Sequence, residues 1–280
     1  PRRVPAGAAR SRRGPMTEAA LPGRLRRRLP ALRPPSRSLS PALSLAVFVA
    51  LWGWGAGTLD SDLLPGPGAV AAAAWREILT GGYLGHLGAT LLRVAAAFAL
   101  AMSLGGAIGV ALGMSRAADR AFGAWLTLFL NLPALVTIIL CYVWFGLTES
   151  AAVAAVAINK IPNVAATLRE GGRALSKDLA EMAALYGFSW RARMRHVVAP
   201  QLAPFVAVAA RNGLALVWKI VLVVELLGRP NGVGFKLYSE FQLFDVAGIL
   251  AYAFGFILVV QAIEWLVLEP WERRANRWRR

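Results

Sequence analysis

The chain has 280 residues, of which 57% are hydrophobic and 16% are charged, and its formal net charge is +16. Soluble domains carry about 25% charged residues, so this composition indicates a membrane protein and excludes an ordinary soluble domain. Much of the positive charge lies at the amino terminus and beside apolar segments, and no basic-aromatic module occurs, which argues against nucleic acid as a partner.

Residues 1–40 form a basic, low-complexity segment with eleven arginines and one glutamate. Because it has almost no large apolar side chains, we expect this segment to be disordered. Met16 is a candidate translation start, and the residues before it would then lie outside the native protein. The apolar stretch that follows lacks a small-residue cleavage site, so we expect a retained span and no secretory signal.

Six apolar segments follow, each near the length needed to cross about 30 Å of hydrocarbon. They cover residues 41–57, 86–114, 121–146, 150–168, 200–228 and 246–268. The sequence therefore predicts an all-α polytopic membrane protein with about six transmembrane helices. The predicted organisation is a first helix at 41–57, a loop at 58–85 with a short interfacial helix at 69–79, a core of about five spans at 86–268, and a basic tail at 269–280.

The charges of the loops predict the orientation of the chain in the membrane. Segment 58–85 carries two more acidic than basic residues, whereas 169–199 and 269–280 each carry three more basic than acidic residues. Basic loops are retained in the cytoplasm, so we expect both termini and the central loop 169–199 to be cytoplasmic.

Gly105, Gly109 and Gly113 recur every four residues in the second span. A stripe of glycines on one helix face lets another helix approach closely. We expect this stripe to pack against a helix of the same subunit, with a dimer interface as the alternative.

The sequence of the loop between the fourth and fifth spans predicts two short helices within it. Asp178 is expected to cap the first, over Leu179–Tyr186, with Glu181 at the third position of a capping box. Gly187 stands where a left-handed residue would end that helix. Ser189 is expected to cap the second helix. This loop would form a docking surface for a partner or, alternatively, an amphipathic element resting on lipid headgroups.

Pro200 follows this loop and begins the fifth span. Because a proline disfavours helical geometry at the preceding residue, we expect the chain to bend at Ala199 as it enters the membrane.

The spacing of this loop resembles the EAA motif of ABC-importer permeases. Glu181-Met182-Ala183 is followed by Gly187, nine residues, and Val197-Val198-Ala199-Pro200, with Met182, Val197 and Ala199 as mild departures from the motif. The resemblance extends over residues 80–270. The segment Trp218–Gly234 is similar to the subgroup that imports nitrate, sulfonates and taurine.

The resemblance implies half of a transmembrane pathway in the bacterial inner membrane. It implies a second copy of the chain, two copies of a cytoplasmic ATP-binding subunit, and an extracytoplasmic substrate-binding protein. The residues implied to couple the permease to the ATPase are Glu181, Ala183, Ala184, Tyr186, Gly187 and Pro200.

The chain itself has no phosphate-binding loop, because it contains no Gly-Lys dipeptide. ATP and magnesium would therefore be bound by the partner, and we expect no cofactor and no catalytic residues here. His86 and His196 fall on opposite predicted sides of the membrane, so no shared metal site is expected. The alternative function is a secondary transporter or channel without an ATPase, which would predict internal repeats.

Polar side chains inside the spans mark a possible route for the substrate. The candidates are Asn131, Asn159, Lys160, Asn163, Asn212 and Lys219. Two lysines would suit an anion. Alternatively, the lysines pair with acids such as Glu225 or reach the headgroups. Arg93 and Arg211 lie near span ends, where we expect their side chains to snorkel to the interface.

Overall fold

The computed structural model describes residues 41–59 and 61–270, and these residues contain helices and turns but no strand. The predicted disordered segment 1–40 and most of the basic tail lie outside the described residues. The chain divides into two compact units, residues 1–46 and 47–280, and the packing described below is that of the second unit.

The helices follow one another through short connections. They are α1 (Pro41–Leu59), α2 (Pro67–Leu79), α3 (Tyr83–Met114), α4 (Arg116–Leu130), α5 (Ala134–Phe145), α6 (Glu149–Arg173), α7 (Lys177–Leu185), α8 (Trp190–Arg193), α9 (Ala199–Gly228), α10 (Val233–Gln242) and α11 (Val246–Ile263). Two π-helical turns, η1 (Met194–Val198) and η2 (Glu264–Leu268), join α8 to α9 and extend α11.

Five helices among the described residues are long and apolar enough to cross a membrane, and α4 with α5 makes a sixth candidate if the bent pair counts as one span. These spans confirm the prediction of an all-α polytopic membrane protein with about six transmembrane helices.

The third predicted span, 121–146, is not one straight helix. α4 and α5 meet at 95° around Asn131–Pro133. Pro133 is the residue just before α5, and it disfavours helical geometry at Leu132. The Asn131 amide donates to the Thr127 carbonyl at 2.8 Å, which satisfies a free carbonyl at the end of α4.

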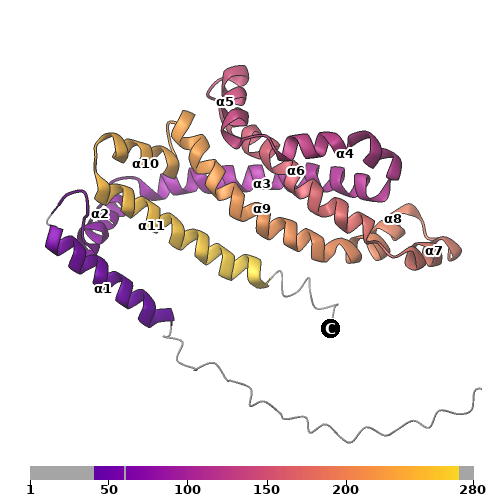
Figure 1. Ribbon diagram of the computed structural model, residues 1–280, viewed down its shortest axis with the longest axis horizontal. Helices are drawn as coiled ribbons and strands as arrows, with labels where there is room; N and C mark the ends of the chain where they lie inside the picture. Colours follow the sequence, from indigo (N-terminus) through magenta and orange to yellow (C-terminus); the bar gives the residue numbers. More distant parts are fainter. Residues whose placement is uncertain (1–40, 60, 271–280) are drawn as a thin grey trace, which may run out of the picture. The chain divides into compact units, whose positions relative to one another are not determined.

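The core is built on α3, α6 and α9, which lie alongside one another (Figure 1). The glycine stripe of α3 faces α6. A Cβ added at Gly105 would lie 2.8 Å from the Ile161 carbonyl oxygen, and one at Gly109 would meet the Ala165 backbone. The predicted packing within one subunit is therefore confirmed.

α2 covers the start of α11. Val70 and Ala73 of α2 are buried in a small apolar cluster with Ala251. The short helix predicted at 69–79 is present and begins two residues earlier, at Pro67, where a proline suits the first turn of a helix.

Candidate functional site

The loop between α6 and α9 contains α7, a turn and α8. Ser176 caps α7, because its Oγ accepts a hydrogen bond from the Leu179 amide at 3.3 Å. The prediction that Asp178 caps this helix is wrong. α7 begins at Lys177, two residues before the predicted start at Leu179, so Asp178 lies in its first turn. A carboxylate there still interacts favourably with the helix dipole. The Ser176 amide also donates to Gln201 Oε1 at 2.9 Å, so the loop is tied to α9.

Gly187 has φ +65°, the left-handed conformation predicted for it. The turn is closed by the Phe188 amide, which donates to the Ala183 carbonyl at 2.9 Å. Ser189 then caps α8 as predicted, accepting from the Ala192 amide at 3.3 Å.

The predicted bend at Ala199 is wrong. Ala199 has φ −59° and ψ −42°, and its amide donates to the Met194 carbonyl across the π-helical turn η1. We attribute the difference to this turn, because its wider spacing relieves the clash that Pro200 would make with the preceding turn of a regular helix. One helical segment thus runs from Trp190 to Gly228, 39 residues long.

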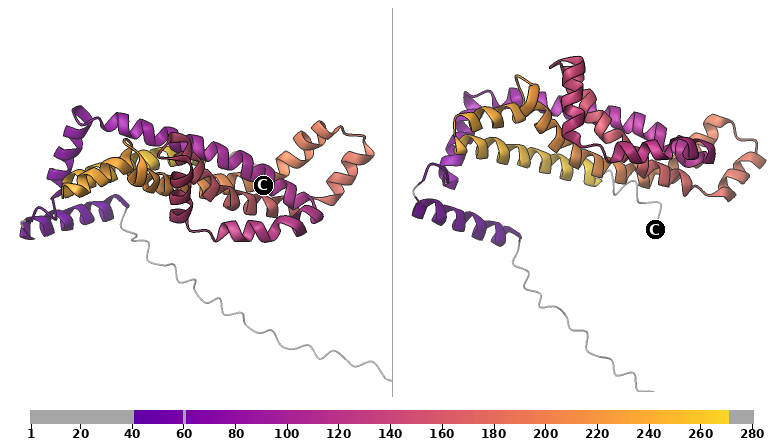
Figure 2. Two further views of the ribbon diagram at one scale, coloured as in Figure 1. Left: turned by 90° about the horizontal axis from the view of Figure 1, so that it is seen from above. Right: turned by 45° about the horizontal axis from the view of Figure 1, so that its top comes forward.

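α7 and α8 protrude from one end of the bundle (Figures 1 and 2). Of the predicted coupling residues, Glu181, Ala184, Tyr186, Gly187 and Pro200 are exposed. Ala183 is 1% exposed, so in this conformation it supports the loop from inside and offers no side chain to a partner.

Large apolar side chains surround these exposed residues. Leu185 is 85% exposed, Tyr186 72% and Trp190 73%. We call Leu185, Tyr186, Phe188 and Trp190 the apolar turn. Sequence reasoning missed three of them, although large apolar residues in an otherwise polar loop are a usable signal of an interaction site.

The predicted pathway residues fall into separate places. Asn163 of α6 and Asn212 of α9 line one hollow of about 440 Å³ together with Thr167. The Asn163 amide donates to the Asn159 carbonyl one turn away, at 3.2 Å. Asn131 lies at the break between α4 and α5, exposed, and lines neither this hollow nor the one described next.

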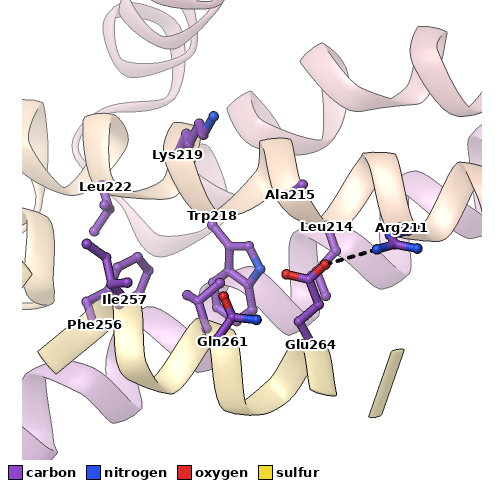
Figure 3. Close-up of a pocket in the computed structure, with 11 residues that line it drawn as sticks. Arg211, Leu214, Ala215, Trp218, Lys219, Leu222, Phe256, Ile257, Gln261 and Glu264 are labelled. Carbon is purple, nitrogen blue, oxygen red and sulfur yellow. Dashed lines mark hydrogen bonds and ion pairs between the residues drawn. The ribbon is translucent and has the colours of Figure 1, made fainter. Parts of the chain in front are cut away.

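A second hollow of about 320 Å³ lies between α9 and α11. Figure 3 shows Trp218 pointing toward α11, whereas the Lys219 side chain points away from α11. Arg211 is exposed and pairs with Glu264 of η2 at 3.5 Å. The structure therefore brings Asn163 and Asn212 together. Lys219 lies two turns from Asn212 along nearly the same face of α9, and its side chain points away from α11.

Lys160 is only 4% exposed. None of the described residues forms a hydrogen bond or ion pair with its side chain. Glu225, the acid offered above as an alternative partner for the lysines, is instead bound by Arg93.

Arg93 does not snorkel, contrary to the prediction. Its side chain is 5% exposed, and its Nη1 lies 2.7 Å from Oε1 of Glu225, which is fully buried. Its Nε donates to Glu149 Oε2 at 2.8 Å, and it also donates to Asn231. A buried arginine is favourable only when its donors are paired, and these partners pair them.

Thr90 completes this cluster. It donates to Glu225 Oε2 at 2.9 Å and accepts from the Val233 amide at 2.8 Å. We call Thr90, Arg93, Glu149, Glu225 and Asn231 the polar node. It joins α3, α6, α9 and the segment before α10, and sequence reasoning missed it because each of its charges stands alone in its own span.

The comparisons with known proteins bear on this arrangement. Residues 102–268 match the family of binding-protein-dependent transport system inner membrane components. The chain is 27% identical over 234 residues to a putative aliphatic sulfonates transport permease protein of Bacillus subtilis (strain 168), covering 79% of this chain and 85% of the relative.

Two relatives from Escherichia coli (strain K12) are also similar. A putative aliphatic sulfonates transport permease protein is 32% identical over 216 residues, 74% of this chain and 81% of the relative. A taurine transport system permease protein is 26% identical over 261 residues, 90% of this chain and 94% of the relative.

The family match covers more than half of the chain and contains both the protruding loop and the long helix that continues from it. The chain therefore belongs to the family of binding-protein-dependent transport system inner membrane components, as a multi-pass permease subunit of an ABC importer.

Proposed function

We propose that the apolar turn and the exposed residues beside it are the docking surface for a cytoplasmic ATP-binding subunit. The observation that carries this proposal is the exposure of Leu185, Tyr186 and Trp190 on a loop that leads without a break into α9. Aromatic residues in such a patch are typical of the centre of a protein interface. Glu181 and Gly187 would orient the loop in the partner's groove, and Pro200 would lie in the first turn of α9, where the long helical segment leaves the loop.

The long helix gives docking a mechanical consequence. At about 1.5 Å per residue, 39 residues from Trp190 to Gly228 span roughly 58 Å. A displacement of α8 by the partner would therefore reach the far end of α9, where the polar node joins it to α3 and α6. ATP and magnesium would be bound by the partner, and this chain would supply no cofactor.

Two copies of the chain would form the pathway, each with an ATP-binding subunit, and a binding protein would deliver the substrate from outside. Both termini would lie in the cytoplasm, as the loop charges predict. The side chains proposed to line the route remain Asn131, Asn159, Lys160, Asn163, Asn212 and Lys219. Asn163 and Asn212 are the best supported of these candidates, because they line one hollow together.

The proposed substrate is a small anion of the sulfonate or taurine kind. The relatives' names support this class, and the two lysines of the route would suit a negative charge. If a Lys219→Met variant transports substrate as well as the unaltered chain does, Lys219 takes no part in binding the anion.

The docking proposal is tested by removing the exposed aromatic side chains. We expect Tyr186→Ala with Trp190→Ala to abolish co-purification of an ATP-binding subunit from the native membrane, since each hot-spot side chain contributes about 2 kcal/mol or more. The matched control is Trp144→Ala with Phe145→Ala, which removes two aromatic side chains of α5 that are also more than half exposed.

If the docking variant keeps the subunit, this surface is not the dock. If the unaltered chain transports substrate without any ATP-binding subunit, the alternative function, a secondary transporter or channel, replaces the proposal.

A further inference from the structure

A polar cavity of about 530 Å³ lies where α3 ends, between the start of α4, the end of α6 and the protruding loop. Four cationic residues from four different helices line it, together with one acid. They are Arg116 of α4, Arg173 of α6, Lys177 of α7 and Arg193 of α8, and the acid is Asp119.

The acid is already neutralised. Asp119 pairs with Arg169 at 2.6 Å and with Arg173 at 2.5 Å. Among the described residues, no acid pairs with Arg116, Lys177 or Arg193. The Nε of Arg193 is buried without a hydrogen-bond acceptor. A buried donor without an acceptor is costly, so the cavity has the donors for an anion that its own residues do not supply.

An apolar groove of about 500 Å³ begins beside this cavity, and Leu112 lines both. Its walls are apolar side chains of α3, α4 and α6, and Phe122 and Trp125 flank it while remaining more than half exposed. Along α4 the groove extends from Ala118 to Phe129, which is about 16 Å at the helical rise. That length is close to one leaflet of a bilayer core roughly 30 Å thick.

We infer that the cavity and groove together bind one anionic phospholipid. The phosphate of the headgroup takes the free donors of Arg116, Lys177 and Arg193, and an acyl chain lies in the groove between α4 and α6. The charge of the cavity favours an anionic headgroup. The groove favours a phospholipid over a free phosphate ion, because only the phospholipid has an acyl chain to fill it. The bound lipid bridges the protruding loop, through Lys177 and Arg193, to the end of α3 and the start of α4.

The family assignment places the chain in a membrane, and that is all this inference takes from it. It does not depend on the ATP-binding partner, because the purified chain in detergent is sufficient for the test.

The experiment measures binding of phosphatidylglycerol to the delipidated full-length chain by native mass spectrometry. Phosphatidylcholine with the same acyl chains and inorganic phosphate are the comparison ligands. We expect Arg116→Gln with Arg193→Gln to weaken phosphatidylglycerol binding by about fivefold for each charge removed. The matched control is Arg120→Gln with Arg195→Gln, which removes two exposed charges outside the cavity and should change binding less than twofold.

A second pair of variants tests the groove. Ala111 lines the groove and is exposed, so Ala111→Trp should fill it and weaken phosphatidylglycerol binding. Ala107→Trp, on an exposed part of α3 outside the groove, should leave binding unchanged.

Three outcomes would overturn the inference. Phosphatidylcholine binding as tightly as phosphatidylglycerol would remove the role of the cations. Equal phosphatidylglycerol binding by the Arg116→Gln/Arg193→Gln variant and by its control double variant would place the lipid elsewhere. Phosphatidylglycerol binding that is unaffected by Ala111→Trp, with inorganic phosphate competing fully, would leave a site for a free anion only.

Discussion

At the scale of the residue, the polar node holds a buried ion pair within the apolar core. Arg93 and Glu225 are both buried and pair with each other, and Arg93 also pairs with the more exposed Glu149. Removing Arg93 leaves the Glu225 carboxylate without a counter-charge in an apolar interior, whereas removing both charges leaves none there.

Arg93→Met is therefore expected to destabilise the chain by about 3 kcal/mol or more. Adding Glu225→Gln to it should restore most of that loss, because the amide oxygen of glutamine can still accept from Thr90 and from the Gly234 amide. Thermal unfolding of the purified variants in detergent measures both effects. Arg76→Gln, which removes an exposed arginine 3.9 Å from Asp245, is the control and should change stability by less than about 0.5 kcal/mol. Equal losses in the single and double variants would contradict the pairing.

At the scale of the element, the contact between α3 and α6 depends on the absence of side chains. The glycine stripe lets the two backbones approach so closely that a Cβ at Gly109 would meet backbone atoms of Ala165, which cannot rotate away. This contact sets the position of α6 and, through it, the place of Asn163 in the hollow shared with α9.

Gly109→Ala should accordingly reduce stability by about 1–3 kcal/mol, the usual cost of overpacking. Gly88→Ala lies in the same helix with no atom within 4 Å of the added Cβ, so it should be neutral or stabilising. Thermal unfolding of both variants under one condition makes the comparison. A neutral Gly109→Ala would mean that α3 and α6 lie farther apart.

At the scale of the whole molecule, composition and hydropathy were sufficient for the class, the spans and the protruding loop. They did not predict the break at Asn131–Pro133, because a hydropathy window measures apolar content. It does not register that a proline lacks the backbone N–H and restricts the residue before it. They did not predict the polar node either, since Arg93 and Glu225 are 132 residues apart and only the folded chain shows that they meet. The bend predicted at Ala199 rests on a local preference of the residue before a proline, and the π-helical turn η1 overrides that preference.

That turn leads to the last prediction, because the connection between docking surface and core runs through it. If α8, η1 and α9 act as one lever, a break in η1 should separate docking from transport. Arg195 is exposed within η1, so Arg195→Pro removes a backbone donor there without removing a buried side chain. We expect this variant to retain the ATP-binding subunit in co-purification, while substrate transport for each ATP hydrolysed falls at least tenfold in proteoliposomes. Arg195→Ala removes the same charge and keeps the helix, so its transport ratio should match that of the unaltered chain. Normal coupling in Arg195→Pro would show that movement reaches the core by another route, such as the short connection from α6 to α7 or the hydrogen bond between Ser176 and Gln201.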